Sequence, residues 1–436
     1  MTANAGYHAY ATGDVLTAAQ VQYNLQNQTV MYFASSAART TALSGVLVEG
    51  MVSYIPANGL EYYNGSAWVL VAADQTPLTT KGDLFTYSTT DTRLPVGANG
   101  TSLVADSSQT TGLGWTATPS ASNPVLNSAF QVWQRGTSFS LAASTSSTYT
   151  ADRWQTSTGA NQACTISRRV TGDTTNLPNI QYAVRYQRNS GQTGTSATGF
   201  DSSQETVNSI PFAGKTITYS FYARCGADYS PTSTGLAYQV ISGTGTDQNV
   251  STGFTGATNV INQTATLTAT WQRFTFSGPV SASATQLGLR FITQWTSTAG
   301  TNDYYEVTGV QIDIGSVALP FRTYAATIQG ELAACERYFE LLPNVYDGPL
   351  GYAYALNSPR IGFKLRTTKR TTPTFTLKSG TIQLRVSGTA TNTSNATLSN
   401  ADVSYIVLDF SGVTIALNAI CGYINNGSTG WIEAEL

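Results

Sequence analysis

Apolar and polar side chains alternate in three runs near the middle of the chain, between Trp271 and Ile314. The alternating apolar positions are Phe274 and Phe276, then Leu287, Leu289 and Phe291, then Val310, Ile312 and Ile314. A period of two places such side chains on one side of a strand, so each run predicts a half-buried antiparallel strand. Turn residues at Gly278-Pro279 and Gly300–Asn302 connect the runs. Three such strands predict half of a β-sandwich.

The same pattern extends over residues 119–324, and its cleanest example is Ile217–Arg224. Further candidate strands are Phe130–Gln134, Asp152–Ser157, Cys164–Arg169, Ile180–Arg188, Glu205–Ile210, Leu236–Ser242 and Thr264–Ala269. About ten strands joined by Gly, Ser and Thr turns predict two packed antiparallel sheets. A parallel β-helix is the rival all-β fold, but it requires a short repeating period that this sequence lacks.

The N-terminal region, residues 1–73, predicts short helices followed by a β-meander. Thr17 and Gln20 fit a capping box for a helix over Thr17–Val30, and a second helix fits Ser35–Leu43. Strands fit Met51–Ile55, Leu60–Tyr63 and Ala67–Val71, with Asn-Gly turns between them. So small a unit buries too little apolar surface to be stable alone. We therefore expect it to dock on copies of itself or on a partner, as an attachment region.

Residues 74–118 are polar, rich in Gly and Pro, and carry only short apolar pairs such as Leu84-Phe85 and Leu103-Val104. A monomer has no core there. Winding identical chains together would supply one, as neighbouring repeats do for each other. The segment is therefore an extended stalk or, alternatively, a flexible tether.

The pattern changes again over residues 325–342. Apolar residues recur there at helical spacing: Ile328, Leu332, Cys335, Phe339 and Leu342. The stripe favours a short helix, either an oligomeric collar or a helix packed on the following sandwich. Two heptads do not define a coiled coil by themselves.

Residues 343–436 predict a second, C-terminal β-sandwich. Candidate strands are Leu350–Leu356, Arg360–Arg366, Thr374–Lys378, Thr381–Ser387, Val403–Phe410, Thr414–Ile424 and Gly430–Leu436. Its one basic patch consists of Lys364, Arg366, Lys369 and Arg370. The patch could meet an anionic polysaccharide, although a short charge run is more often a solvated face.

Composition narrows the function classes. Lys and Arg number 22 against 24 Asp and Glu, and charged residues are only 11% of the chain. Such a chain does not attract a phosphate backbone, so nucleic-acid binding is not expected. A single His, His8, argues against a Ser-His-Asp or multi-His metal site. No signal segment or long apolar run is present, which predicts synthesis in a cytoplasm without membrane insertion.

Polar loops containing aromatic residues are the best ligand candidates. Trp295 lies in such a loop with Asn302, Asp303, Tyr304 and Tyr305, and the ring has no obvious core to fill. One interpretation is glycan contact, and the alternatives are simple loop packing or an intersubunit contact. Asp247 and Asn249 form a second polar loop that could hold a sugar, but two oxygen ligands are too few for calcium. Tyr352, Tyr354 and Trp431 are further candidates. No cofactor or metal is expected.

A second aromatic cluster lies in the VWQRG and ADRW segments. It could be a sugar platform of stacking rings and hydrogen-bonding Arg and Asp, but core packing of the tryptophans with an Asp152–Arg pair is favoured. Its members are Trp133, Arg135, Asp152, Arg153 and Trp154.

Three longer segments along the chain carry a resemblance to a known family. EGMVSYIPANGLEYYNGSAWVLV resembles the N-terminal module of phage fibre and minor tail proteins, and TTKGDLFTYSTTDTRLPVGANG resembles a tail-fibre linker. NPVLNSAFQVWQRGTSF is similar to the opening of a jelly-roll domain like those of carbohydrate-binding modules. The resemblance implies a mainly β virion appendage, a homo-oligomer and most often a trimer. It implies attachment to other virion proteins through the N-terminal region and binding of host surface polysaccharide through jelly-roll and terminal sandwiches.

Two other functions compete with receptor binding. A purely structural virion decoration or spacer would need no ligand site. A capsule depolymerase needs two carboxylates about 5–9.5 Å apart, and Asp201, Glu205, Asp303, Glu306 and Asp313 are the available acids. Because acids are sparse and no motif frames a pair, we expect no catalytic activity.

Overall fold

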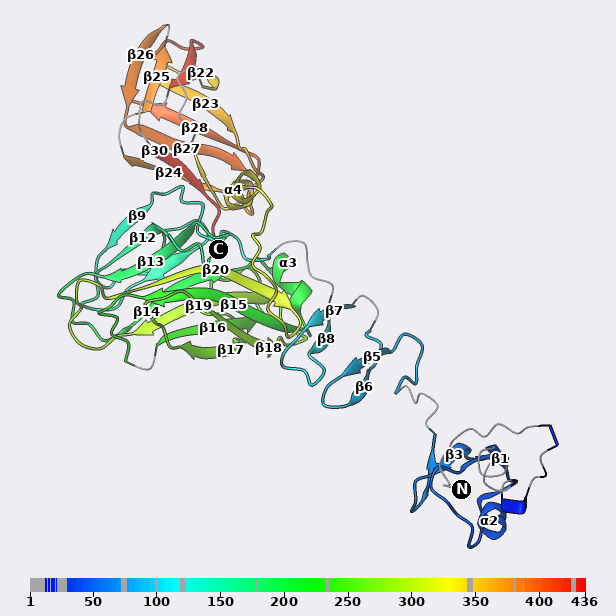
Figure 1. Ribbon diagram of the computed structural model, residues 1–436. Coiled ribbons are helices and arrows are strands. Elements are labelled where there is room, and N and C mark those ends of the chain that lie inside the picture. Colours follow the sequence, from blue (N-terminus) through cyan, green and yellow to red (C-terminus); the bar gives the residue numbers. More distant parts are fainter. Residues whose placement is uncertain are drawn as a thin grey trace. The chain divides into compact units, whose positions relative to one another are not determined.

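The computed structural model describes residues 12–13, 15, 17–19, 21, 30–71, 77–98, 101–117, 123–177, 179–232, 235–342, 348–379, 382–386, 388–424 and 429–436. Its elements are labelled in Figure 1. Two compact units cover the chain: Met1–Val96 with Thr110–Gly112, and Gly97–Gln109 with Leu113–Leu436. The described residues include no helix that is both long and apolar enough to cross a membrane.

The first unit contains a four-stranded sheet in the order β1-β2-β3-β4. Its elements are β1 (Val30–Tyr32), α2 (Ser36–Ala42), β2 (Val52–Ile55), β3 (Gly59–Tyr63) and β4 (Trp68–Leu70). The predicted second helix and the meander are confirmed, and Ser35 caps α2 by accepting from the Ala38 amide. The buried Arg39 pairs with Glu61 at 2.5 Å beneath the Trp68 ring. The predicted helix over Thr17–Val30 falls mostly outside the described residues.

Two hairpins follow the meander. The strands are β5 (Leu84–Tyr87), β6 (Asp91–Leu94), β7 (Thr101–Ala105) and β8 (Leu113–Ala117). Asp83 fixes the start of the first hairpin, because its carboxylate accepts from the amides of Thr79, Thr80 and Val96. These bonds lower the pKa of Asp83 despite the opposing effect of desolvation. Whether these hairpins belong to an oligomeric stalk stays a prediction.

The first sandwich is made of two six-stranded antiparallel sheets packed face to face. The β19 sheet consists, in order, of β10 (Thr148–Tyr149), β11 (Gln155–Ser157), β14 (Ala197–Ser203), β19 (Gln286–Gln294), β16 (Leu236–Gly243) and β17 (Thr258–Ala265). The β13 sheet consists of β18 (Gln272–Pro279), β15 (Thr216–Cys225), β20 (Tyr304–Ile314), β13 (Tyr182–Arg188), β12 (Cys164–Val170) and β9 (Ser138–Leu141).

The three central runs are strands, as predicted, but they do not share one sheet. β18 and β20 flank β15 in the β13 sheet, whereas β19 lies in the other sheet. Their apolar faces meet in one core, where Phe221 and Phe291 pack edge to face at 4.9 Å and Trp154 stacks on Phe200 at 5.1 Å. Each fully buried aromatic of this kind stabilises the fold by about 1.5–3 kcal/mol. The core reading of Trp133 and Trp154 is therefore confirmed.

Three predicted strands of this domain are wrong. Thr264–Ala269 lies mostly in the loop after β17, which ends at Ala265. Phe130–Gln134 is a turn in which Phe130 has a positive φ of 52°. The Asn127 side chain holds this turn, because its oxygen accepts from the Val132 amide and its nitrogen donates to the Val132 and Asp152 carbonyls. Residues 206–212 are helical instead, in α3 (Thr206–Ser209) and η2 (Ile210–Phe212), and Pro211 lies in the first turn of η2.

The helix of residues 325–342 is shorter than predicted. α4 covers Ile328–Glu336, and Phe339 then belongs to the strand β21 (Phe339–Leu341). Cys335 is fully buried and Leu342 pairs with Gly430 in the terminal sandwich. The buried Glu331 on α4 accepts from the Asn127 amide of the first sandwich at 2.5 Å. The stripe is thus split between a helix and a strand that pack inside this chain, and an exposed oligomeric collar over residues 325–342 is wrong.

The terminal sandwich packs a seven-stranded sheet against a three-stranded one. The larger sheet consists, in order, of β26 (Thr389–Thr393), β25 (Ile382–Val386), β29 (Ile420–Ile424), β22 (Leu350–Ala355), β23 (Ser358–Lys364), β28 (Tyr405–Ser411) and β27 (Asn395–Asp402). The smaller sheet consists of β21, β30 (Thr429–Glu433) and β24 (Thr374–Ser379). It has a separate apolar core, so the mainly β fold with two sandwiches is confirmed.

Candidate functional site

The outer face of the β13 sheet is polar where strands β12, β13 and β20 lie side by side. Alternation sends Cys164 and Ile166 into the core and leaves Thr165, Ser167 and Arg169 on the other face. The antiparallel register sets Thr165 opposite Gln187, and Ser167 opposite Arg185. In the next strand Tyr304 and Glu306 continue these two rows. A regular sheet therefore assembles hydrogen-bonding side chains from segments far apart in sequence.

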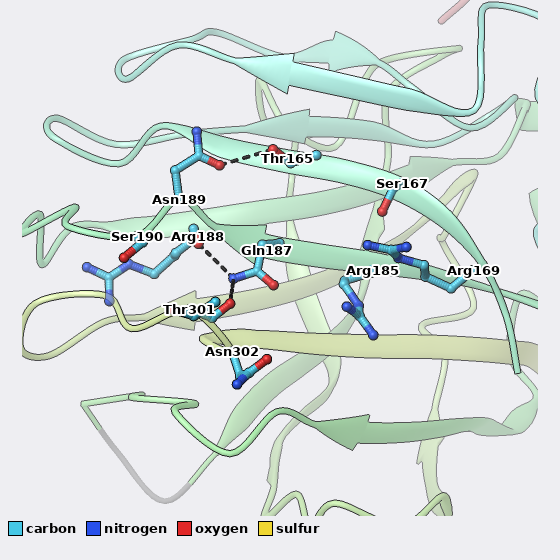
Figure 2. Close-up of a pocket in the computed structure, with 10 residues that line it drawn as sticks. All are labelled: Thr165, Ser167, Arg169, Arg185, Gln187, Arg188, Asn189, Ser190, Thr301 and Asn302. Carbon is cyan, nitrogen blue, oxygen red and sulfur yellow. Dashed lines mark hydrogen bonds between the residues drawn. The ribbon is translucent and has the colours of Figure 1, made fainter.

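A cavity of about 430 Å³ opens on this face. Figure 2 shows its lining residues, which come from β12, β13 and the loops that follow β13 and precede β20. They are Thr165, Ser167, Arg169, Arg185, Gln187, Arg188, Asn189, Ser190, Thr301 and Asn302. Every one of these residues has a polar side chain that donates or accepts hydrogen bonds, and none is a carboxylate.

Hydrogen bonds hold one end of the cavity in place. The Gln187 side-chain nitrogen donates to the carbonyls of Arg188 (2.8 Å) and Thr301 (3.2 Å), which ties the loop before β20 to β13 (Figure 2). The Thr165 hydroxyl donates to the Asn189 side-chain oxygen at 3.0 Å. The Asn302 amide donates to the Asp228 carboxylate at 2.6 Å. These contacts fix the backbone and leave the Asn302 side chain facing the cavity.

Positive charge dominates the other end. The Glu306 carboxylate is completely buried and pairs with Arg185 at 2.7 Å and Arg224 at 2.6 Å. Arg185 also lies 3.7 Å over the ring of Tyr304. Because one carboxylate serves two guanidinium groups, this trio keeps a net positive charge, and Arg169 adds another beside it.

Three of the five predicted loop residues lie beneath this face rather than on it. Trp295 and Tyr305 are 0% exposed, and Trp295 packs among Tyr186, Tyr229 and Tyr305 while its indole nitrogen donates to Thr198. The expectation that this ring lacks a core to fill is wrong, because those three tyrosines supply one.

The buried Asp303 pairs with Arg188 at 2.7 Å and accepts from Ser230. Desolvation raises the pKa of this carboxyl. The pair ties loops together, so Asp303 is likewise not available to a glycan. Of the loop candidates, only Asn302 and Tyr304 lie on the outer face, and Asn302 lines the cavity.

The second polar loop lies against the terminal sandwich. Asp247 accepts from the Thr206 amide and pairs with Arg370 at 3.3 Å, and the Asn249 side chain donates to the Leu436 carbonyl at 2.9 Å. These residues connect the two sandwiches, which corrects the expectation of a free sugar-binding loop. No cluster of three or more His, Cys, Asp or Glu residues that could hold a metal occurs in the described part of the chain.

The predicted basic patch is largely neutralised at the same junction. Lys369 is 1% exposed and pairs with Glu340 at 2.5 Å, and Arg366 pairs with Glu336 at 3.0 Å. Arg370 donates to the carbonyls of Ala434 and Glu435. Only Lys364 is exposed without such a contact. The possible patch for anionic polysaccharide is therefore wrong, because three of its members bind acids or carbonyls within the chain, and the favoured solvated face is wrong for the buried Lys369.

The terminal sandwich has a second candidate surface, which we call the tyrosine platform: Tyr352, Tyr354, Arg360 and Gly362. Tyr352 is 52% and Tyr354 41% exposed on β22. The Arg360 guanidinium lies 4.0 Å over the Tyr354 ring and pairs with Asp409. No atom lies within 4 Å of where a Cβ of Gly362 would be, which leaves open space on β23 two residues from Arg360. Trp431, the third aromatic candidate, is half-buried and packs near Phe339.

Sequence reasoning missed most of the cavity. Thr165, Ser167, Arg169, Arg185 and Gln187 are common strand residues whose alternation was visible. Nothing in the sequence indicated that β13 would pair with β12 on one side and with β20 on the other. The sequence did contain one signal of this surface: β12 and β13 each carry polar residues on one side and apolar residues on the other.

No protein-family model matches this chain, and no curated protein matches it. Solved structures similar to it include the xylan-binding CBM22-1 domain of Paenibacillus barcinonensis Xyn10C, at 13% identity and a TM-score of 0.28, covering 46% of this chain and 100% of that one.

A CBM4 structure is 22% identical over 30% of this chain and 71% of its own, with a TM-score of 0.22. The enzymatically active domain of bacteriophage CBA120 tailspike protein 4 is 14% identical over 44% of this chain and 21% of its own, with a TM-score of 0.28. Identities and scores this low say nothing about ligand or activity.

Proposed function

We propose that this chain is a phage virion fibre protein that binds host cell-surface polysaccharide in the cavity on the first sandwich. The observation that carries the proposal is the lining itself, made only of hydrogen-bonding residues on a regular sheet. Saccharides present many hydroxyls, and a surface of fixed donors and acceptors binds them without first paying to order its own side chains. The cavity of about 430 Å³ also falls within the usual range of small-ligand sites.

The state of the acidic residues supports binding rather than hydrolysis. A glycosidase needs one carboxyl that holds a proton and a second that acts as base or nucleophile. No carboxylate lines the cavity, and each candidate acid lies outside it and pairs with an arginine: Asp201 with Arg290 (3.1 Å), Glu205 with Arg337 (2.8 Å), Asp303 with Arg188 (2.7 Å), Glu306 with Arg185 (2.7 Å) and Asp313 with Arg322 (2.7 Å). Release of oligosaccharides from capsule by the purified protein would favour the depolymerase alternative.

The N-terminal unit supports the virion part of the proposal. One face of its sheet aligns apolar side chains across all four strands: Val30, Val52, Tyr62 and Val69 in one row, and Tyr32, Tyr54 and Leu60 in the next. Most of these residues are exposed. An exposed apolar face of this kind suits association with other chains.

We place this unit at the virion and assign the protein a trimeric state, with synthesis in the bacterial host's cytoplasm. The mass in solution tests the oligomer: a trimer gives three times 46.2 kDa, and a monomer contradicts it. Deletion of residues 119–436 that leaves virion adsorption intact would favour the structural spacer alternative.

The binding site is tested with Asn302→Ala in the full chain. Its side-chain amide faces the cavity and makes no hydrogen bond to other described residues. Losing the bonds it makes to a glycan lowers affinity about two- to tenfold, measured on host capsule or envelope polysaccharide. Asn259→Ala, an exposed asparagine of β17 in the other sheet, is the matched control and leaves affinity unchanged. Wild-type protein that binds no host polysaccharide overturns the proposal.

A further inference from the structure

The hydroxyl of Ser167 is a buried group without a partner. Ser167 is 6% exposed, and its Oγ makes no hydrogen bond in the structure. It lies in the wall of the cavity, between Thr165 and Arg169 on the same face of β12. A buried polar atom left unpaired costs about 1–3 kcal/mol. Such an atom at the wall of an open cavity is suited to donate to a ligand.

Arg169 is the second group without a partner. Within the described part of the chain, its guanidinium makes no hydrogen bond and no ion pair. It lies on the same face as Ser167, two residues further along β12. Figure 2 shows Arg169 and Arg185 at the same corner of the cavity as the Ser167 hydroxyl. The chain thus holds an uncompensated cation at one defined corner.

Neighbouring charge does not cancel this cation. Arg185 is the register partner of Ser167, and it shares the buried Glu306 carboxylate with Arg224. No acid lines the cavity. Asp228 contacts the far end through the Asn302 backbone amide, and Asp173 binds the amides of its own loop and also interacts with Arg224. Together with Arg169, three guanidinium groups therefore meet two carboxylates, Glu306 and Asp173, and one positive charge remains. Like charges placed as neighbours on one sheet face repel, and an anion between them would relieve that repulsion.

We propose that the corner formed by Ser167, Arg169 and Arg185 binds an anionic oxygen group carried by a saccharide, so that the preferred ligand is an acidic polysaccharide. Arg169 supplies a guanidinium fork for a carboxylate, sulfate or phosphate, and Ser167 donates its otherwise unpaired hydroxyl. Gln187, Asn189 and Asn302 remain for the sugar hydroxyls. This inference rests on the proposed function of the same cavity and adds the charge class of its ligand.

The test uses the full chain and an array of paired oligosaccharides. Each uronate oligomer is printed with its methyl ester, and each sulfated or phosphorylated oligomer with its unsubstituted form. We expect binding to the charged member of a pair, and the two kinds of pair separate a carboxylate ligand from a sulfate or phosphate one. Arg169→Gln removes the preference and lowers affinity for the charged member about ten- to a hundredfold, the usual effect of one charge-assisted bond.

Ser167→Ala separates a binding role from a structural one. It removes a hydroxyl that has no partner in the protein, so thermal stability stays equal or rises while affinity for the charged member falls about three- to tenfold. Lys215→Gln, an exposed lysine before β15 in the same sandwich, is the control for an equal loss of charge and leaves binding unchanged.

Two failures can be told apart. Equal binding to both members of every pair, or no loss with Arg169→Gln, overturns the inference and leaves glycan binding in place. No binding to any member overturns the proposed function and this inference together.

Discussion

The two sandwiches place their aromatic side chains in opposite positions. In the first sandwich the rings fill the core, and Trp295 and Tyr305 are completely buried. In the terminal sandwich Tyr352 and Tyr354 stand on the outer face of a sheet, whereas Ala353 between them points into the core. An aromatic residue in a polar loop can therefore lie in the core, and alternating tyrosines can lie on the surface. The exposure of such a ring depends on which side of its sheet other elements pack against.

The largest expected effect is on the core of the first sandwich. Trp295→Ala leaves a void among Tyr186, Tyr229 and Tyr305 and removes the bond to Thr198. We expect a loss of about 3–5 kcal/mol in the free energy of unfolding, measured by chemical denaturation. Tyr352→Ala serves as the surface counterpart and should change it by less than about 0.5 kcal/mol. Equal losses in the two variants would contradict the difference between a buried and an exposed aromatic ring.

The next effect concerns the contact between the sandwiches. Arg153 is buried, stacks 3.6 Å over Tyr338 and pairs with Glu435, which also contacts Arg135 at 3.1 Å. Glu435→Gln leaves a buried guanidinium without its carboxylate, at a cost of about 3 kcal/mol. Differential scanning calorimetry should then resolve separate transitions for the two sandwiches. Glu433→Gln, whose side chain is more exposed, is the milder control. A single unchanged transition would contradict the role of Glu435 in coupling the two sandwiches.

The pH dependence of stability should differ in sign between the buried Asp201 and the partly exposed Asp409. Burial raises the pKa of Asp201 in the first sandwich to about 6, against the opposing effect of Arg290. Its contribution to stability is therefore complete below pH 3.8, the ordinary value, and is lost as the pH rises through about 6, by about 2–3 kcal/mol. In the terminal sandwich the hydrogen bonds from Arg360 lower the pKa of Asp409, so its contribution is present above pH 3.8 and is lost as the pH falls.

Denaturation of wild type, Asp201→Asn and Asp409→Asn between pH 3 and 7 checks both signs. Asp201→Asn should flatten the decrease of stability toward pH 7. Asp409→Asn should change the stability only at the acid end of this pH range. A wild-type stability that rises steadily from pH 4 to 7, unaffected by Asp201→Asn, would refute the first sign.

The smallest expected effect is a change in polysaccharide affinity when the tyrosine platform is altered. If the exposed Tyr352 ring stacks on a sugar, Tyr352→Ala lowers affinity for host polysaccharide about two- to tenfold with little change in stability. Titration calorimetry with the full chain measures both variants. Tyr87→Ala, which changes a still more exposed tyrosine of the first hairpin, should have no effect on affinity. Unchanged affinity in Tyr352→Ala would leave the cavity as the sole candidate.

The sequence by itself determined the strands, because the period of two in runs such as Ile217–Arg224 is a local property of the chain. It also determined the hairpin turns of the N-terminal meander, where Gly59 and Gly65 have φ values of 91° and 92° that suit glycine. It indicated Asn302 as a candidate, which the structure places in the cavity wall.

Only the tertiary structure decided which strands are neighbours and therefore which polar side chains meet. Ser167, Arg185 and Glu306 lie in one row because β12, β13 and β20 pair in that register, and no local pattern encodes a pairing between strands more than a hundred residues apart. Only the tertiary structure decided which tyrosines of β22 are exposed. A Cβ at Gly351 would collide with the Arg360 backbone and the Ile361 side chain, so close packing on that side turns Tyr352 and Tyr354 outward.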